Sequence, residues 1–156
     1  MTWETAINVA TLLSALAAAI GVIVSFLSFR KQMHARLFLH FTDRYEKVIS
    51  EFPSDARGKR MLIDGEPPEP SEELNCAVLR YLNLCSEEFY LHDRGYLPTR
   101  IWNIWRKGLE ATVCSPLLRR EWKTLRQEYD PYPEFQRFID GVQNIGDWRN
   151  SSKSGG

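Results

Sequence analysis

The sequence is poor in the features that mark several large classes of protein. Its three cysteines are too few, and odd in number, for a disulfide-stabilised secreted domain, which indicates a reducing compartment. Basic and acidic residues are equal at 20 each, so the positive excess of a nucleic-acid-binding protein is missing and we expect no nucleic-acid partner. Hydrophobic residues make up 44% of the 156, which excludes a disordered chain and predicts an ordered one of single-domain size.

Motifs of the common enzyme and metal-binding classes are also missing. The sequence has no glycine-rich phosphate loop, nucleophile elbow or kinase signature. His34 and His40 are six residues apart, on different faces of a helix, and Cys76 and Cys85 are nine apart. Zinc sites need several Cys or His ligands at short spacing. We therefore expect no metal, no cofactor and no catalytic residue.

One small group of acid–base residues permits a different interpretation. Glu88 lies four residues before His92, and Glu87 is adjacent, so the three are candidates for the acid–base group of an enzyme acting at a membrane surface. The same spacing is typical of an ordinary pair near the end of a helix, where a histidine also suits the helix dipole. We favour the second interpretation.

A long uncharged segment dominates the N-terminal part of the chain. It runs from Ile7 to Phe29, and about 20 helical residues span the hydrocarbon core of a bilayer. A signal peptide would carry positive charge before a shorter apolar core, whereas the only early charge here is Glu4. The pattern predicts one transmembrane helix, with residues 1–29 forming the N-terminal segment and anchor.

The charges around this segment predict its orientation. Arg30, Lys31 and Arg36 follow it and no basic residue precedes it. Lysine and arginine flanking a span tend to remain in the cytoplasm. We therefore expect a single-pass protein of the inner (plasma) membrane, with its N-terminus outside and residues 30–149 forming a cytoplasmic helical domain.

One face of the predicted span carries small residues at intervals of three and four. Small side chains allow helices to approach closely in lipid, so this face predicts association with a second copy or with another membrane protein. The alternative is that alanine and serine are simply common in membrane helices. The candidate association residues are Ala10, Ser14, Ala17, Gly21 and Ser25.

The rest of the chain has the periodicity of helices and no sustained alternation typical of strands. Ser71 and Ser115-Pro116 are helix start signals, and Gly95 is a stop signal. We predict an all-α fold in which the transmembrane helix continues into a bundle of about five helices. Its segments are a first helix ending before Pro53, a loop over 53–70, helices from 71, 98 and 115, a final short helix after the break at 130–133, and a disordered tail over 150–156.

The predicted loop contains both a basic cluster and an apolar island. Arg57, Lys59 and Arg60 form the densest basic run, a possible contact for a phosphate, nucleotide or lipid headgroup, although nearby acidic residues favour an ordinary solvated loop. Residues 61–63, Met-Leu-Ile, are expected to pack against the bundle.

Two tryptophans three residues apart, Trp102 and Trp105, fall on one helix face. Tryptophan is enriched in protein–protein hot spots, so both are candidates for partner binding. Paired large aromatics at helical spacing are more often core residues, and we expect at least one of them to be buried.

The single apolar segment is followed by two characteristic segments, YLNLCSEEFYLHDRGYLPTRIWNIWRKGLEA (81–111) and EYDPYPEFQRFID (128–140). In this arrangement the chain resembles a group of small bacterial single-pass membrane proteins of uncharacterised function. The resemblance implies one anchor and a helical cytoplasmic domain, and it implies no activity.

Three functions remain open. The first, which we favour, is a membrane-anchored, non-enzymatic interaction or scaffold protein whose helical domain holds a partner, or a second copy, at the bilayer. The second is a ligand-gated membrane effector of a bacterial stress or phage-defence system, sensing a ligand near the basic cluster. The third is the membrane-surface enzyme that uses Glu87, Glu88 and His92.

Overall fold

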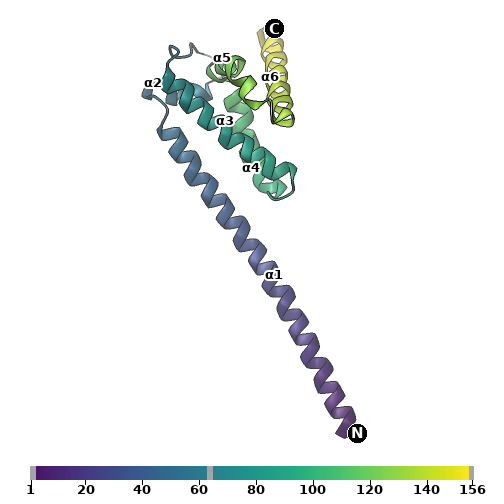
Figure 1. The fold of residues 1–156 in the computed structure, drawn as a ribbon. Coiled ribbons are helices and arrows are strands. Elements are labelled where there is room, and N and C mark those ends of the chain that lie inside the picture. Colours follow the sequence, from purple (N-terminus) through teal and green to yellow (C-terminus); the bar gives the residue numbers. More distant parts are fainter. Residues whose placement is uncertain (1–2, 63–64, 155–156) are drawn as a thin grey trace. The chain divides into compact units, whose positions relative to one another are not determined.

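The computed structural model describes residues 3–62 and 65–154. Over these residues it contains helices and no strand (Figure 1), so the all-α prediction is confirmed, together with a long apolar helix at the N-terminus. The elements are α1 (Trp3–Ser50), α2 (Ser54–Arg57), the 3-10 helix η1 (Lys59–Met61), α3 (Glu72–Asp93), α4 (Thr99–Val113), α5 (Pro116–Leu125), the 3-10 helix η2 (Arg126–Tyr129) and α6 (Pro133–Ser154).

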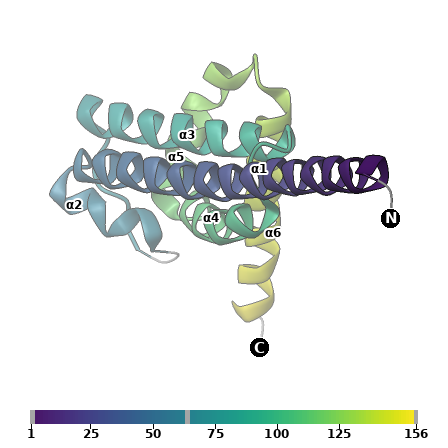
Figure 2. The same cartoon turned by 90° about the horizontal axis from the view of Figure 1, so that it is seen from below.

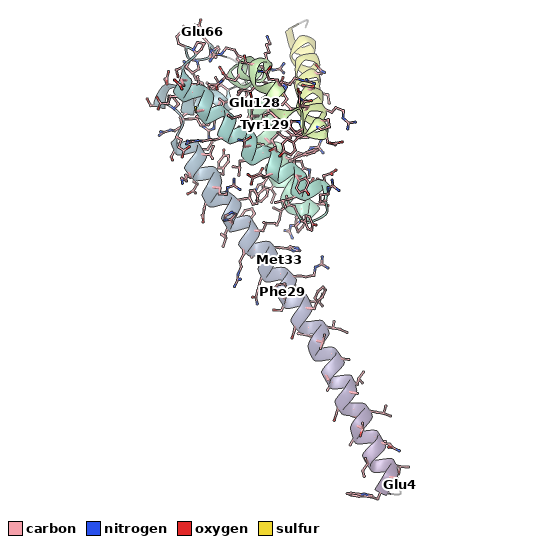
Figure 3. All side chains as sticks on the ribbon, viewed as in Figure 1. Glu4, Phe29, Met33, Glu66, Glu128 and Tyr129 are labelled. Carbon is pink, nitrogen blue, oxygen red and sulfur yellow. The ribbon has the colours of Figure 1, made fainter. Side chains whose placement is uncertain are left out.

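The chain divides into two compact units, residues 1–40 and 41–156. The first contains the N-terminal part of α1, and every side chain described from Trp3 to Met33 is exposed. Figure 3 shows the side chains of Phe29 and Met33 projecting from this helix. Among the described side chains of α1, the first that is buried is Phe41, which is 4% exposed. The core of the second unit therefore includes the last turns of α1.

The central helix of the second unit is α3, and its predicted start and stop are both confirmed. The Ser71 hydroxyl accepts a hydrogen bond from the Leu74 backbone N–H at 3.1 Å, which satisfies one of the free donors at the helix N-terminus. After α3, Gly95 adopts a φ of 73°, a left-handed conformation that glycine adopts without strain. The predicted apolar stripe is buried except for Phe89, which is half-buried: Leu74, Val78, Tyr81, Leu82 and Cys85.

Helices α4, α5 and α6 also begin where the sequence predicts. Pro98 is the N-cap residue of α4. The Ser115 hydroxyl accepts from the Leu118 N–H at 3.3 Å, and Pro116 occupies the first turn of α5, where its missing N–H costs nothing. Pro133 begins α6.

Helices α4, α5 and α6 all contact α3, and Figure 2 shows α6 running crosswise to it. An aromatic cluster fills the space between them. The Phe89 ring lies 5.8 Å from Phe135 and 5.1 Å from Phe138, and Trp122 lies 5.5 Å from Tyr129. Burying each large side chain contributes about 1.5–3 kcal/mol, so this cluster is a principal source of stability.

Two segments differ from prediction. The loop over 53–70 contains α2 and η1, and its buried residues include Ala56 and Arg60, whereas Leu62 of the apolar island is 49% exposed. Met61 is also exposed but contacts Thr112, and Ile63 lies outside the described residues. Within this segment the Ala56 methyl group of α2, which is 0% exposed, packs inward. Helix α6 continues to Ser154, past the boundary predicted for a disordered tail, since no proline or glycine interrupts residues 147–154.

Candidate functional site

The N-terminal half of α1 is an apolar surface. Leu12, Val22 and Phe29 are 71%, 69% and 63% exposed, and none of the most hydrophobic stretch of the helix is buried. A core helix of a water-soluble protein would be largely buried. Exposed apolar surface of this extent marks a membrane or protein contact, and the helix is long and apolar enough to cross a bilayer.

The predicted small-residue face is exposed along this helix. Ser14 already donates its hydroxyl hydrogen to the Ala10 carbonyl at 2.9 Å, so it bonds within its own helix. At Gly21 an added Cβ would meet nothing within 4 Å. The face therefore has no steric obstacle to a second helix, and whether one binds remains a prediction.

The two tryptophans have different environments. Trp102 is 3% exposed, and its ring stacks on His92 with centroids 4.9 Å apart. It is a core residue, as one of the two interpretations expected, and its burial removes it as a partner-binding surface. Trp105 is half-buried and lies 5.3 Å from the Phe41 ring.

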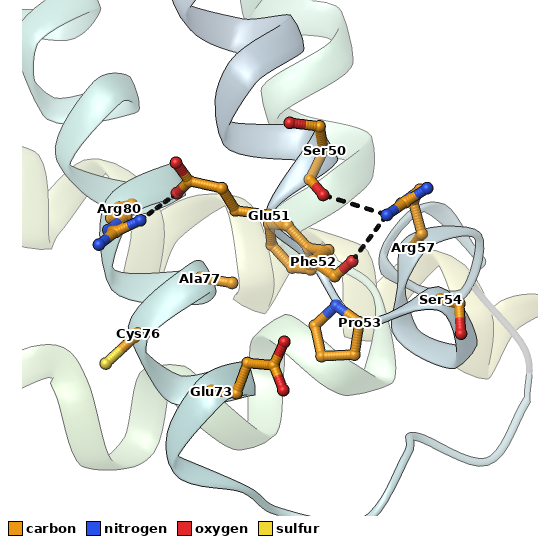
Figure 4. A pocket seen from close by; sticks show the side chains of 10 residues that line it. All are labelled: Ser50, Glu51, Phe52, Pro53, Ser54, Arg57, Glu73, Cys76, Ala77 and Arg80. Carbon is orange, nitrogen blue, oxygen red and sulfur yellow. Dashed lines mark hydrogen bonds and ion pairs between the residues drawn. The ribbon is translucent and has the colours of Figure 1, made fainter.

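The basic cluster lies beside an open hollow of about 510 Å³ where α1 ends (Figure 4). Arg57 donates hydrogen bonds to the carbonyls of Ser50 and Phe52 at 3.1 and 3.2 Å. These are free acceptors at the C-terminus of α1, where a positive charge is also favoured by the helix dipole. Arg57 thus caps a helix.

Arg60 is mostly buried. It donates to the Arg57 carbonyl, and its guanidinium lies 5.8 Å from the centre of the Phe52 ring. Lys59 is exposed, and it takes part neither in the helix cap made by Arg57 nor in the packing of Arg60 on Phe52. Two of the three residues predicted to contact an anion therefore have structural roles: Arg57 caps α1 and Arg60 packs on Phe52.

The other charges of this hollow are balanced. Arg80 forms an ion pair with Glu51, as Figure 4 shows, and Glu73 also lines the hollow. Two acidic and two basic side chains thus share the space. An anion would meet no net positive charge there, so the geometry does not favour the predicted phosphate contact.

The proposed acid–base group is also dispersed. Glu87 binds the Arg44 guanidinium through both of its oxygens, one at 2.9 Å, while the His92 ring lies flat on Trp102 with its Nδ1 buried and unpaired. Glu88 lines a different space. No hydrogen bond or ion pair joins these three described side chains, and none joins the predicted helix-end pair of Glu88 and His92.

Glu88 instead lines a hollow of about 180 Å³ between the last turns of α1, α3 and α4. We call it the Glu88 hollow. Its walls are largely apolar and aromatic, and include Phe41, Tyr45, Trp105 and Leu109. Glu88 is 7% exposed, an unusual position for a carboxyl group.

Burial raises the pKa values of three ionisable side chains on this face of α3. It raises the pKa of Glu88 to about 8, against a smaller opposing effect of the Arg44 charge. Burial also raises the pKa of Tyr81 and of Cys85 well above their ordinary values. Near neutral pH all three groups are therefore in their neutral forms, as burial among apolar groups favours.

From the sequence, Glu88 was named as a candidate beside Glu87 and His92, but its burial was not predicted, although a signal for it was present. Tyr81, Cys85 and Glu88 follow the i, i+4, i+7 spacing of one helix face. A carboxyl group on the buried face of an amphipathic helix is the type of exception that indicates a functional position.

Within residues 3–62 and 65–154, no group of three or more His, Cys, Asp or Glu side chains is placed to hold a metal ion. Comparison with family models, with curated proteins and with solved structures finds no match. The resemblance to small bacterial membrane proteins therefore stays a prediction.

Proposed function

We propose that this protein is a membrane-anchored, non-enzymatic interaction protein, in which α1 crosses the inner membrane once and residues 30–149 work in the cytoplasm. The observation that carries the proposal is the exposure of every described side chain from Trp3 to Met33 in an uncharged, span-length segment. Only lipid or another apolar helix would remove this surface from water.

The orientation follows from the charges that flank the segment. Arg30, Lys31 and Arg36 are all exposed, so they are available to lipid headgroups and oppose transfer across the bilayer. The exposed thiol of Cys76 is compatible with a reducing cytoplasm.

The interaction role is supported by the division of the chain into an apolar helix and a separately packed unit. In the hollow beside the C-terminus of α1 the acidic and basic side chains are equal in number and Arg80 pairs with Glu51. No hydrogen bond or ion pair joins the described residues proposed for acid–base chemistry. A tethered binding module accounts for this combination better than a catalyst does.

The test is the mass of the native complex. The full chain is extracted from membranes in a mild detergent and weighed by light scattering with the detergent contribution subtracted. We expect a mass of at least two chains, or of this chain with another membrane protein. A lone protomer across a range of detergents and protein concentrations would contradict the proposal.

The contribution of the small-residue face is tested by Gly21→Leu, which places a large side chain where the helices would approach. The matched control is Val22→Leu, one position along the helix and already large and exposed. We expect Gly21→Leu to reduce the mass of the complex and Val22→Leu to leave it unchanged. Equal behaviour of the two variants would exclude this face as the contact.

A further inference from the structure

We propose that the Glu88 hollow binds a small apolar amine, whose ammonium group pairs with the Glu88 carboxylate while its apolar body packs against the rings of Phe41, Tyr45 and Trp105. This inference is independent of membrane insertion, because all of the residues lining the hollow belong to the unit formed by residues 41–156. It adds a ligand site to a proposed interaction protein.

The charges around the hollow favour a cation. The nearest basic group, Arg44, is held by both oxygens of Glu87, so its charge is already matched. If Glu88 were ionised, Arg44, Glu87 and Glu88 together would carry a net negative charge. A ligand ammonium supplies the missing positive charge, and a buried charge requires such a partner.

The aromatic walls favour the same ligand. The Phe41 and Trp105 rings are 5.3 Å apart and tilted by 42°, and Tyr45 lies 6.5 Å from Tyr81. Aromatic faces attract cations, and more strongly where water is excluded. Phe41 already attracts one cation, because the Arg44 guanidinium lies 5.5 Å from its centroid.

The size of the hollow limits the ligand. Its 180 Å³ is below the roughly 300–1,000 Å³ of sites for drug-sized molecules. Gly108 lines the hollow without a side chain, and nothing lies within 4 Å of the position a Cβ would occupy. One ring with a short aminoalkyl chain is the size that fits.

Binding involves a balanced proton transfer. Between pH 5 and 7 the unliganded hollow contains a neutral Glu88 carboxyl group, and the amine in solution is an ammonium ion. When they pair, the carboxyl group gives its proton to the buffer and becomes the carboxylate of the ion pair. One proton is therefore released for each amine bound.

The test uses the full chain in lipid nanodiscs at pH 6.5, with 2-phenylethylamine as the probe. Heat of binding is measured in two buffers of different ionisation enthalpy, and the heat from empty nanodiscs is subtracted. We expect saturable binding with release of about one proton per amine. Absence of binding at millimolar amine, or binding without proton release, would overturn the proposal.

Two other probes determine which chemistry the hollow recognises. 2-Phenylethanol has the same body without the charge, and 3-phenylpropionate carries the opposite charge. Both are expected to bind at least about tenfold more weakly than the amine. If either binds as tightly as the amine, the Glu88 hollow is not an ammonium site.

Variants locate the binding. Glu88→Gln is expected to lose the proton release and to weaken binding at least about tenfold. The control is Glu110→Gln, which changes a half-buried carboxyl group on α4 that pairs with Arg106 and does not line the hollow, and it is expected to bind as the unchanged chain does. Trp105→Leu preserves an apolar wall but removes the aromatic face, and should weaken binding about tenfold. It provides the second test if Glu88→Gln does not fold. Unchanged affinity in either folded variant would contradict the proposal.

Discussion

Gly146 of α6 lies so close to Cys114 that a Cβ added to the glycine would be 2.8 Å from the cysteine Sγ and 2.7 Å from the Arg119 guanidinium. The region is fixed by hydrogen bonds. Arg119 donates to the carbonyls of Cys114 and Gln143 at 2.9 Å each, and the Gln143 amide donates to the Val113 carbonyl at 2.9 Å. The close approach of α6 thus depends on the missing side chain.

Gly146→Ala is therefore expected to destabilise the protein by about 1–3 kcal/mol, the usual cost of inserting a methyl group into a packed contact. The measurement is urea denaturation followed by far-ultraviolet circular dichroism. The control is Gly141→Ala in the same helix, where an added Cβ meets nothing within 4 Å. That change should be neutral or stabilising by up to about 1 kcal/mol. Equal destabilisation by both changes would contradict the packing described for α6.

The buried Glu88 carboxyl group gives a pH dependence of known sign. Its pKa is about 8 in the folded chain, against a reference value of 4.5. Between pH 4.5 and pH 8, Glu88 is therefore protonated in the folded state and ionised in the unfolded state. The contribution to stability is complete below pH 4.5 and falls by about 1.4 kcal/mol per pH unit until pH 8.

Glu88→Gln does not titrate, so it should remove this fall and be more stable than the unchanged chain at pH 8. The measurement is the free energy of unfolding at pH 5, 6.5 and 8. Glu134→Gln, an exposed change on α6, should retain the original slope. If the slope persists in Glu88→Gln, another group is responsible for it.

The cap of α3 provides a third test. Ser71→Ala removes the oxygen that accepts from the Leu74 N–H, and loss of an N-cap costs about 1 kcal/mol. Ser86→Ala, in the interior of the same helix, should be neutral or slightly stabilising because alanine is the better helix former. A smaller effect of Ser71→Ala than of Ser86→Ala would show that the cap is not formed.

The helix starts could be predicted because their causes are local. Each start signal affects only the few residues next to it and does not depend on what the helix packs against. The signals are Ser71, Pro98, Ser115 and Pro116. The apolar stripe of α3 was predictable for the same reason, since helical spacing alone places its members on one face.

The remaining features depend on contacts between elements distant in the sequence. The inward turn of Ala56, the close approach of Gly146 and the hollow beside Glu88 each require the surface of another helix. The sequence predicted that Arg57 and Arg60 belong to a solvated or anion-binding cluster. It could not show that their guanidinium groups donate hydrogen bonds to backbone carbonyls, because those contacts depend on how the chain folds. Periodicity specifies a face, but not what covers it.

The membrane topology is tested most directly by labelling Cys76. This cysteine is exposed, whereas Cys85 is buried, so it is a natural reporter for the domain that we place inside the cell. Bacterial spheroplasts producing the unaltered chain are treated with a maleimide that cannot cross membranes, before or after lysis. The labelled site is then identified by peptide mass.

We expect the chain in the membrane fraction, with Cys76 labelled only after the membrane has been opened. A companion chain with Thr2→Cys and Cys76→Ser should be labelled in intact spheroplasts. Equal labelling of Cys76 in intact and lysed spheroplasts, or recovery of the full chain in the soluble fraction without detergent, would contradict the central claim.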